Sequence, residues 1–214
     1  MKKLRILIAD DHALVRQGLR SVLEAQTGWT VCGQAQDGRE AVKLGLKLKP
    51  DIFLLDVTMP ELNGLDATRQ IYRSLPGVPI LILTMHESEE LCEEAVQAGA
   101  SGCVLKSDSP RELLAAVAAV AAGGKYFTRP TGSGPRSVGQ RFGGAGPMPA
   151  RLSAREREIV QLLAEGHTSK EIASRLGIAF KTVDAHRTNI MRRLNVHAVA
   201  DLVRYAVRER IIQA

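Results

Sequence analysis

Two kinds of hydrophobic pattern divide the chain. In residues 1–122, short apolar runs alternate with segments in which apolar residues recur every three or four positions. The runs have the length of β-strands, and polar residues, glycine or proline bound them, which is typical of buried parallel strands. The predicted strands are Leu4–Ala9, Thr30–Ala35, Ile52–Leu55, Pro79–Leu83 and Gly102–Leu105.

The segments between these runs have helical spacing. They are His12–Ala25, Arg39–Leu48, Gly64–Ser74, Ser88–Ala98 and Ser109–Ala122. Strands that alternate with helices of this length form parallel sheets, because each helix crosses over from one strand to the next. The first part of the chain is therefore predicted to be an α/β domain, a doubly wound five-stranded parallel sheet with flanking helices.

Both patterns stop at Arg129. Residues 129–150 contain six glycines and four prolines and show no apolar period, so we predict a flexible linker, with a long ordered loop as the alternative. A separate all-α domain follows, with four predicted helices. Ser153–Glu156 and Thr168–Glu171 are capping-box sequences that open the first two, and Gly177 provides the turn into the third. The predicted domains are residues 1–128 and 151–214.

Composition and the apolar runs restrict the class and the compartment of the protein in three ways. The 214 residues are 45% hydrophobic and 24% charged, as in folded globular proteins. Three cysteines without metal-ligand spacing indicate a reducing compartment, and Met1–Lys3 leads directly into a strand rather than into a signal peptide. The longest apolar run, Leu113–Ala122, is too short to cross a membrane. We therefore expect a cytoplasmic protein without a membrane partner.

Charge is distributed unevenly between the two parts. Residues 1–128 contain 14 basic and 16 acidic side chains, whereas residues 151–214 contain 12 basic and 7 acidic ones. The net charges are thus −2 and +5. A polyanion is the expected partner of the second part alone.

Polar side chains follow four of the predicted strands. Asp10 and Asp11 follow the first strand, Asp56 the third, Thr84 the fourth and Lys106 the fifth. Ligands of open parallel sheets bind at the carboxyl ends of the strands. Clustered carboxylates repel one another, and a bound Mg²⁺ relieves this repulsion. The Lys106 ammonium and the Thr84 hydroxyl can bind phosphoryl oxygens through charge and a hydrogen bond. Each acid alone would more often be a cap or a solvated loop residue, so the prediction depends on the joint set.

These motifs resemble the receiver domain of bacterial two-component response regulators. The resemblance extends over residues 1–122, and together with the tail it points to the NarL/FixJ type. The matching segments are Ile8-Ala9-Asp10-Asp11-His12, Leu54-Leu55-Asp56-Val57-Thr58-Met59-Pro60, Asn63-Gly64, Leu83-Thr84-Met85-His86, Gly99-Ala100 and Leu105-Lys106. The resemblance implies a flavodoxin-like fold.

The resemblance also implies a role for each site residue. Asp56 accepts a phosphoryl group from the phosphohistidine of a sensor histidine kinase. Asp10, Asp11, Asp56 and the backbone carbonyl of Thr58 hold Mg²⁺. Lys106 pairs with the phosphoryl group and Thr84 moves to hydrogen-bond it. The protein would then be a phosphoacceptor regulator and not an enzyme, apart from catalysing its own phosphorylation and dephosphorylation.

One position departs from the family pattern. Receivers usually have Tyr or Phe three residues before the lysine, with a ring that turns inward on activation, and here that residue is Cys103. We interpret Cys103 as a small packing residue in preference to a redox centre. His12 and His86 also fall near the site, and His86 is open to two interpretations, contact with the attacking water or an exposed loop position.

The predicted helix from Phe180 to Leu194 has two faces. At about 100° per residue, Val183, Ile190 and Leu194 share one side and a polar set lies on the other. An ordinary surface helix is the alternative to a helix that enters the DNA major groove. The context favours DNA, because Leu152–Glu158, Gly166, Lys170–Ala173, Lys181–Val183, His186-Arg187 and Ile190–Leu194 resemble the LuxR-type helix-turn-helix.

That resemblance makes this segment the recognition helix for double-stranded DNA. Asp184, Ala185 and Thr188 are candidates for contacts with base edges. Lys181, Thr182, Arg187 and Arg192 are candidates for phosphate contacts, which position the protein without specifying sequence. The last helix, about 198–208, implies a homodimer when the protein is activated, and RNA polymerase is a further candidate partner.

Two other functions compete with this interpretation. A Mg²⁺-dependent phosphatase with an aspartyl nucleophile would need an acid two residues after Asp56, where Thr58 stands. A DNA-binding protein controlled without phosphate would use the first domain only as a dimerisation platform, and Cys103 keeps that alternative open.

Overall fold

The computed structural model describes residues 3–85, 88–127, 152–196 and 198–212. The predicted linker and His86 lie outside these residues. The described residues form two compact units, one within residues 3–127 and the other within residues 152–212. No helix in the described ranges is long and apolar enough to cross a membrane.

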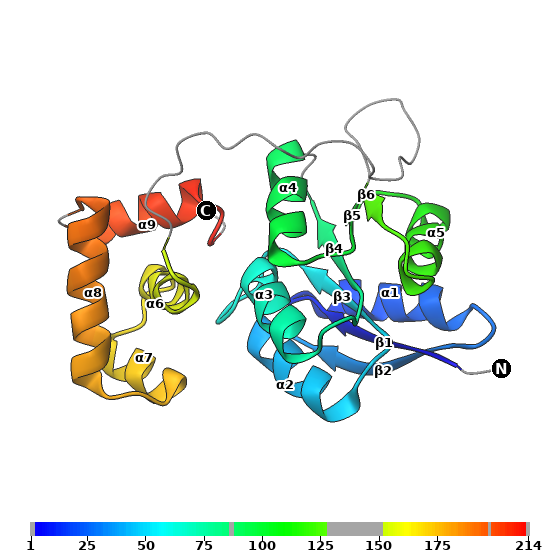
Figure 1. Ribbon diagram of the computed structural model, residues 1–214, viewed down its shortest axis with the longest axis horizontal. Helices are drawn as coiled ribbons and strands as arrows, with labels where there is room; N and C mark the ends of the chain where they lie inside the picture. The colour runs from blue at the N-terminus through cyan, green and yellow to red at the C-terminus, as the bar shows by residue number, and fades with distance from the viewer. Residues whose placement is uncertain (1–2, 86–87, 128–151, 197, 213–214) are drawn as a thin grey trace. The chain divides into compact units, whose positions relative to one another are not determined.

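The first unit is built on a six-stranded, wholly parallel sheet with the order β2-β1-β3-β4-β5-β6 (Figure 1). The strands are β1 (Leu4–Ala9), β2 (Trp29–Ala35), β3 (Ile52–Asp56), β4 (Ile80–Thr84), β5 (Gly102–Leu105) and β6 (Tyr126–Phe127). The α/β class and the parallel sheet are confirmed, but the expected count of five strands was wrong. Strand β6 has only two residues, and it is defined by its pairing with Gly102 and Cys103.

Five helices cover the two faces of this sheet. They are α1 (Ala13–Glu24), α2 (Gly38–Leu48), α3 (Gly64–Ser74), α4 (Glu89–Ala98) and α5 (Pro110–Ala121). Figure 1 shows α1 and α5 on one face and α2, α3 and α4 on the other. Every described element that the periodicity predicted in this unit begins and ends within one residue of its expected bounds.

Local side-chain bonds explain where these helices begin. The side chains of Asp37, Asn63 and Ser88 accept hydrogen bonds from backbone N–H groups in the first turns of α2, α3 and α4. Ser109 and Glu112 form a complete capping box at α5. Such caps satisfy N–H groups that have no partner within the helix.

Alternate strand residues form the core on the side of α1 and α5. Because successive side chains of a strand point to opposite faces, one residue in two reaches this core. Its strand members are Ile6, Ile8, Ile52, Leu54, Leu81, Leu83 and Val104, which contact Leu23 of α1 and Leu113, Ala116, Val117 and Val120 of α5. The strands are apolar on both faces, as the sequence predicted for a buried parallel sheet.

The second unit consists of four helices, α6 (Ala154–Ala164), α7 (Ser169–Leu176), α8 (Phe180–Leu194) and α9 (Val199–Arg208). Both predicted capping boxes are present, at Ser153–Glu156 and Thr168–Glu171. Gly177 has a φ of 63° and closes α7 in the left-handed conformation, which places α8 directly after a tight turn. Ala179 stands at the N-cap of α8 and provides no side-chain bond.

Candidate functional site

The polar residues predicted at strand ends lie together at the carboxyl edge of the sheet. Asp10 follows β1, Asp56 ends β3, Thr84 ends β4 and Lys106 follows β5. Strand β1 lies between β2 and β3, so the connections after β1 and β3 depart to opposite sides of this point. This is the position at which open α/β sheets bind their ligands.

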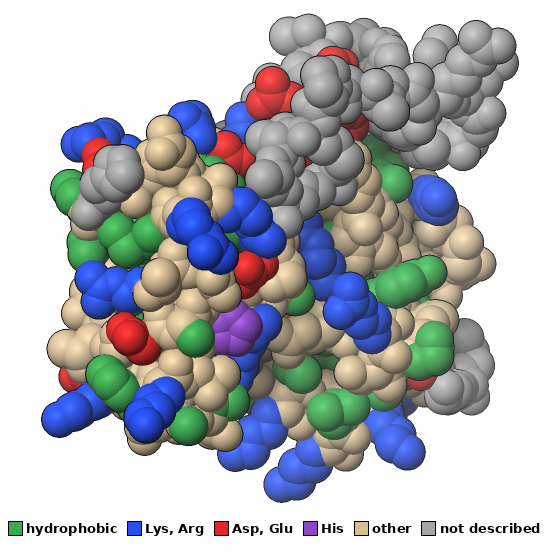
Figure 2. All heavy atoms as spheres, turned by 60° about the vertical axis from the view of Figure 1, so that its left-hand side comes forward, with side chains coloured by type: hydrophobic (Ala, Val, Ile, Leu, Met, Phe, Trp, Pro, Cys, Tyr) green, Lys and Arg blue, Asp and Glu red, His purple; other side chains and the backbone are tan. Residues whose placement is uncertain are grey.

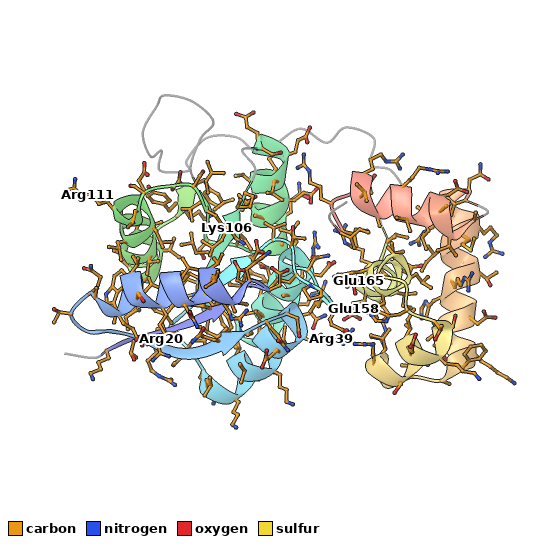
Figure 3. All side chains as sticks on the ribbon, turned by 180° about the vertical axis from the view of Figure 1, so that it is seen from behind. Arg20, Arg39, Lys106, Arg111, Glu158 and Glu165 are labelled. Atoms are coloured by element: carbon orange, nitrogen blue, oxygen red, sulfur yellow. The ribbon has the colours of Figure 1, made fainter. Side chains whose placement is uncertain are left out.

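Lys106 joins two acidic residues from different strands. Its Nζ lies 2.6 Å from Oδ2 of Asp10 and 2.9 Å from Oδ2 of Asp56. All three side chains are at least nine-tenths buried. The backbone N–H of Lys106 donates to the carbonyl of Thr84 at 2.7 Å, which fixes where the lysine leaves the sheet. Figure 3 labels Lys106 within the receiver unit.

Burial changes the proton affinity of Asp56. Removal from water raises the pKa of its carboxyl group from 3.8 to about 6, and the charges of Asp10 and Asp11 raise it too, while Lys106 opposes the change. Burial by itself would lower the pKa of Lys106, but the two carboxylates outweigh burial and raise it. A cation is therefore maintained beside Asp56, and it stabilises any negative charge at this edge of the sheet.

Asp10, Asp11 and His12 form a compact group of oxygen and nitrogen donors. Their ligand-capable atoms lie within 4.8 Å of one another. Asp10 is fully buried and accepts a hydrogen bond from the backbone N–H of His12 at 2.8 Å. Asp11 is exposed, and its Oδ1 lies 2.7 Å from Nδ1 of His12. Two carboxylates at an open edge suit a hard divalent cation.

The contact between His12 and Asp11 was missed from the sequence. The sequence placed His12 near the site without giving it a partner. The only sequence feature that could have indicated this contact is the position of His12, which directly follows the acidic pair and is the N-cap of α1. A protonated His12 would compete with a metal cation for the Asp11 carboxylate.

The start of α3 brings backbone close to Asp56. A Cβ atom on Gly64 would lie 1.9 Å from the carbonyl oxygen of Asp56, so only glycine fits there. The N–H of Gly64 donates to the carbonyl of Val57 at 2.8 Å. Asn63 caps the helix by accepting from the N–H of Asp66 at 2.8 Å. Asn63 and Gly64 therefore hold the chain that leaves Asp56 in a fixed path.

Two threonines complete the predicted set. Thr84 is buried and lies opposite Leu105 in the register of β4 and β5. Thr58 is half-buried, two residues after Asp56. The structure thus brings Asp10, Asp56 and Lys106 into direct contact, with Asp11 beside Asp10 and Thr84 on the neighbouring strand.

Helix α8 has the two faces that its sequence predicts. Val183 and Ile190 are fully buried. Arg187 is half-buried, and the other residues predicted to contact DNA are exposed: Lys181, Thr182, Asp184, Ala185, Thr188 and Arg192. This outward surface of α8, formed by these seven residues, is called the α8 polar face below.

Ionic contacts hold α8 against the rest of its domain. Nη2 of Arg193 lies 2.6 Å from Oε2 of Glu156. The same oxygen closes the capping box with Ser153. Arg155 donates to the carbonyl of Leu176 at 3.0 Å and thereby satisfies the end of α7. Val183 and Ile190 belong to one core with Ile159, Leu162 and other apolar residues of α6, α7 and α9. The α8 polar face is therefore presented on a fixed helix.

Basic side chains outnumber acidic ones in the helical domain. Figure 2 shows Lys and Arg side chains spread over this domain with fewer acidic side chains between them. The charges agree with the net charge of +5 counted for residues 151–214. Such a surface attracts a polyanion over a distance set by the salt concentration.

Two family models match the chain in the places that the two units occupy. The response regulator receiver domain matches residues 6–118, and the LuxR family of bacterial regulatory proteins matches residues 150–206. The chain therefore belongs to the response regulators of the NarL/FixJ type, in which a receiver domain precedes a LuxR-type helix-turn-helix. Proteins of this class are transcriptional regulators of two-component systems.

Curated relatives match along nearly the whole chain. The transcriptional regulatory protein MctR of Rhizobium johnstonii is 36% identical over 211 residues, which cover 98% of this chain and 96% of MctR. The oxygen regulatory protein NreC of Staphylococcus carnosus is 37% identical and covers 98% and 99%. The transcriptional regulatory protein LiaR of Bacillus subtilis is also 37% identical, with the same coverage.

Solved structures give the same result. The RcsB response regulator of Salmonella typhimurium has a TM-score of 0.62 and 29% identity, and the match covers 96% of this chain and 97% of RcsB. A LuxR-family two-component response regulator from Aurantimonas has a TM-score of 0.58 and 40% identity over 60% of this chain and 91% of its own.

Proposed function

We propose that Asp56 is the phosphoacceptor of this response regulator. The observation that carries the proposal is the contact of Lys106 with both Asp10 and Asp56 at the carboxyl edge of the sheet. Asp56 is the one carboxylate of this group that ends a strand in the middle of the sheet. The expected donor is the phosphohistidine of a sensor histidine kinase.

Ionised Asp56 is the nucleophile in this proposal. One of its carboxylate oxygens attacks phosphorus, and the bond between phosphorus and the donor breaks, which leaves an acyl phosphate on Asp56. The Lys106 ammonium then turns from the carboxylate to the phosphoryl oxygens, and the Thr84 hydroxyl donates to another. Positioning and charge neutralisation account for most of the catalysis in such transfers.

Mg²⁺ is the proposed cofactor. The donor set fits it, since Asp10 and Asp11 present carboxylate oxygens beside Asp56, and the carbonyl of Thr58 is the remaining protein ligand that we assign. When bound, Mg²⁺ would neutralise charge on the phosphoryl oxygens. His12 must then give up its contact with the Asp11 carboxylate.

We further propose that phosphorylation controls a homodimer that binds double-stranded DNA. The α8 polar face enters the major groove, where Asp184, Ala185 and Thr188 face base edges. Lys181, Thr182, Arg187 and Arg192 contact phosphates. The exposure of six of these seven residues supports the assignment. RNA polymerase is the partner that a bound activator would recruit.

The domain boundaries of this proposal are residues 1–128 for the receiver and 151–214 for the DNA-binding domain. Residues 129–150 would be the linker that allows the second domain to change its position. DNA and the phosphorylated kinase domain are both found in the cytoplasm, so the proposed functional compartment is the cytoplasm.

The test is a phosphorylation assay with Mg²⁺ and acetyl phosphate, a small phosphodonor that replaces the kinase. We expect one acid-stable but alkali-labile phosphoryl group on the wild-type chain, found by intact mass, and none on Asp56→Asn. Asp37→Asn is the matched control, because the Asp37 side chain caps the first turn of α2 and asparagine also caps a helix well. A phosphoryl group that is still found on Asp56→Asn would overturn the assignment. Continuous release of phosphate from many phosphate esters would indicate that the protein is a phosphatase.

Light scattering with Mg²⁺ and beryllofluoride, a phosphoryl mimic, tests the link to assembly. We expect a monomer that becomes a dimer in the wild type and remains a monomer in Asp56→Asn. Binding of beryllofluoride without a change in mass would favour the alternative in which DNA binding is controlled without phosphate. Cys103, which replaces the family's aromatic residue, is the observation that favours that alternative.

A further inference from the structure

Two cysteines of the receiver domain are in contact. Cys92 lies on α4 and Cys103 on β5, and their side chains hydrogen-bond to each other. Cys103 is buried and Cys92 is half-buried, so a small solute can reach only the second. Cys32, the third cysteine, lies on β2 and is separated from β5 by three strands of the sheet.

The backbone holds both partners in place. Cys103 is paired in register with Ile82 on one side and Phe127 on the other. Helix α4 ends at Gly99, whose φ of 104° turns the chain directly back into β5. The N–H groups of Ala100 and Ser101 complete this turn by donating to the carbonyls of Ala95 and Ile80. Helix α4 packs on β5, and this packing holds the two elements that carry Cys92 and Cys103 side by side (Figure 1).

The two thiols are not equivalent. The hydrogen bond from Cys103 lowers the pKa of Cys92 against the opposing effect of its burial. The same bond, together with burial, raises the pKa of Cys103. Thiolate is the reactive form of cysteine, so Cys92 is the group that attacks and Cys103 the group that resolves.

We propose that Cys92 and Cys103 form an intramolecular disulfide when the receiver domain meets a peroxide. The Cys92 thiolate attacks one oxygen of hydrogen peroxide, the O–O bond breaks, and the departing hydroxide takes a proton to become water. Cys92 is then a sulfenic acid. The Cys103 sulfur attacks the Cys92 sulfur, the S–O bond breaks, and hydroxide leaves with the Cys103 proton as a second water. Two thiols are oxidised and one peroxide is reduced.

The disulfide would tie α4 covalently to β5, the strand that leads into Lys106. This consequence rests on the proposed function, whereas the chemical step does not. Position 103 is where the family places its moving aromatic side chain, and a cross-link at this position prevents α4 from shifting relative to β5. Oxidation is therefore expected to prevent the response to phosphorylation, and reduction to restore it.

The direct test is peptide mapping of the full chain after exposure to hydrogen peroxide under non-reducing conditions. We expect the wild type to lose the mass of two hydrogen atoms, with Cys92 linked to Cys103 and Cys32 still alkylated by iodoacetamide. Cys32→Ser is the matched control and should oxidise like the wild type. Cys103→Ala should stop at the Cys92 sulfenic acid, which dimedone traps, and Cys92→Ser should give neither product.

Two results would overturn the proposal. One is that Cys92 and Cys103 both remain alkylatable in the wild type after peroxide has already oxidised Cys32. The other is that the only disulfides join two chains through Cys32. Because both results are measured on the wild type, the test does not depend on how well Cys103→Ala folds.

Light scattering with beryllofluoride measures the consequence for assembly. We expect the reduced protein to dimerise and the mapped, oxidised protein to remain monomeric until dithiothreitol is added. Equal dimerisation of both forms would overturn the regulatory role of the disulfide. A reduced protein that does not dimerise would instead contradict the proposed function, and the mapping result would stand.

Discussion

The receiver domain and the helical domain place their functional charges in opposite environments. In the receiver, Lys106, Asp10 and Asp56 are nearly or fully buried and touch one another. In the helical domain, Lys181, Asp184 and Arg192 lie exposed on α8. Charges interact strongly where water is excluded, whereas water and salt screen exposed charges.

This difference determines how each region tolerates change. Each buried charge depends on the few partners that it touches, because an unpaired charge away from water is costly. Exposed charges contribute to binding through many weak contacts, so one substitution removes only a part of the binding free energy. Replacing one residue should therefore have a large effect in the receiver and a small one on α8, in the order of the four predictions that follow.

Lys106→Ala should have the largest effect. It leaves the Asp10 and Asp56 carboxylates side by side without their cation, and it should lower the free energy of unfolding of the receiver by about 3–5 kcal/mol. Trp29, the only tryptophan, lies on β2, so its fluorescence during urea unfolding reports this domain. Saturating Mg²⁺ should restore part of the loss.

The control for this substitution is Lys43→Ala, which removes an exposed lysine from α2. It should change the stability by less than about 0.5 kcal/mol. Equal effects of the two substitutions would show that the buried ion pair contributes no more than an exposed charge and would remove the contrast between the two regions.

The pH dependence of stability should show a smaller effect of the same burial. The carboxyl group of Asp56 has a pKa of about 6 in the folded protein against 3.8 for a free aspartate side chain, so the folded state binds more protons than the unfolded state between these pH values. Asp56 therefore contributes to the free energy of unfolding below about pH 4. This contribution is lost as pH rises through 6, a change of up to about 3 kcal/mol.

Asp56→Asn removes this titration. Without Mg²⁺, the stability of the variant relative to the wild type should increase from pH 4 to pH 7, measured by urea unfolding with Trp29 fluorescence. Asp37→Asn should keep the wild-type dependence. If the curves of Asp56→Asn and the wild type run parallel, burial does not raise the pKa of Asp56.

Glu156→Ala should have an intermediate effect in the helical domain. It removes both the capping-box carboxylate of α6 and the partner of Arg193 on α8. Arg193 is 39% exposed, so screening limits the ion pair, and the added cost should be about 1 kcal/mol above that of a lost cap.

Hydrogen exchange measured by mass spectrometry locates this effect. Amides of α8 should exchange about five times faster in Glu156→Ala, since about 1 kcal/mol corresponds to that factor. Glu171→Ala removes the equivalent carboxylate of α7 and should leave α8 unchanged. Identical exchange of α8 in the two variants would mean that the bond to Arg193 contributes nothing.

Single charges of the α8 polar face should have the smallest effects, and they should differ in kind. Arg192→Ala should weaken binding to all duplexes and lower the salt dependence by about one phosphate contact. Asp184→Ala should change the ratio between a duplex selected by the wild type and a random duplex, because a carboxylate can accept from cytosine N4. Fluorescence anisotropy over a salt series measures both, and equal changes on the two duplexes would contradict the role of Asp184 in sequence choice.

Local patterns in the sequence were sufficient for the elements of both domains. The apolar period and the capping boxes at Ser153 and Thr168 involve residues within one helical turn, so the helices whose bounds the sequence predicted begin and end within one residue of the observed ones. Strand β6 could not be predicted in this way. Tyr126 and Phe127 are too few to show a period, and only their pairing with β5 makes them a strand.

The candidate site was predicted from its residue types but not from its contacts. Acidic residues, a hydroxyl and a lysine at four strand ends indicated the edge of the sheet. The sequence did not show that Lys106 touches both Asp10 and Asp56, that His12 contacts Asp11, or that Cys92 meets Cys103. Each contact joins atoms whose separation depends on strand order or side-chain packing.

The sequence by itself determined which segments are strands and helices, which face of α8 is polar, and which family the motifs indicate, because these properties depend on neighbours within a few residues. Only the tertiary structure decided that β1 and β3 are adjacent and that β5 brings Lys106 to their ends. It also excluded water from Asp56 and so raised the pKa of its carboxyl group. Burial is a property of the assembled sheet and its helices, and no short segment of the chain contains it.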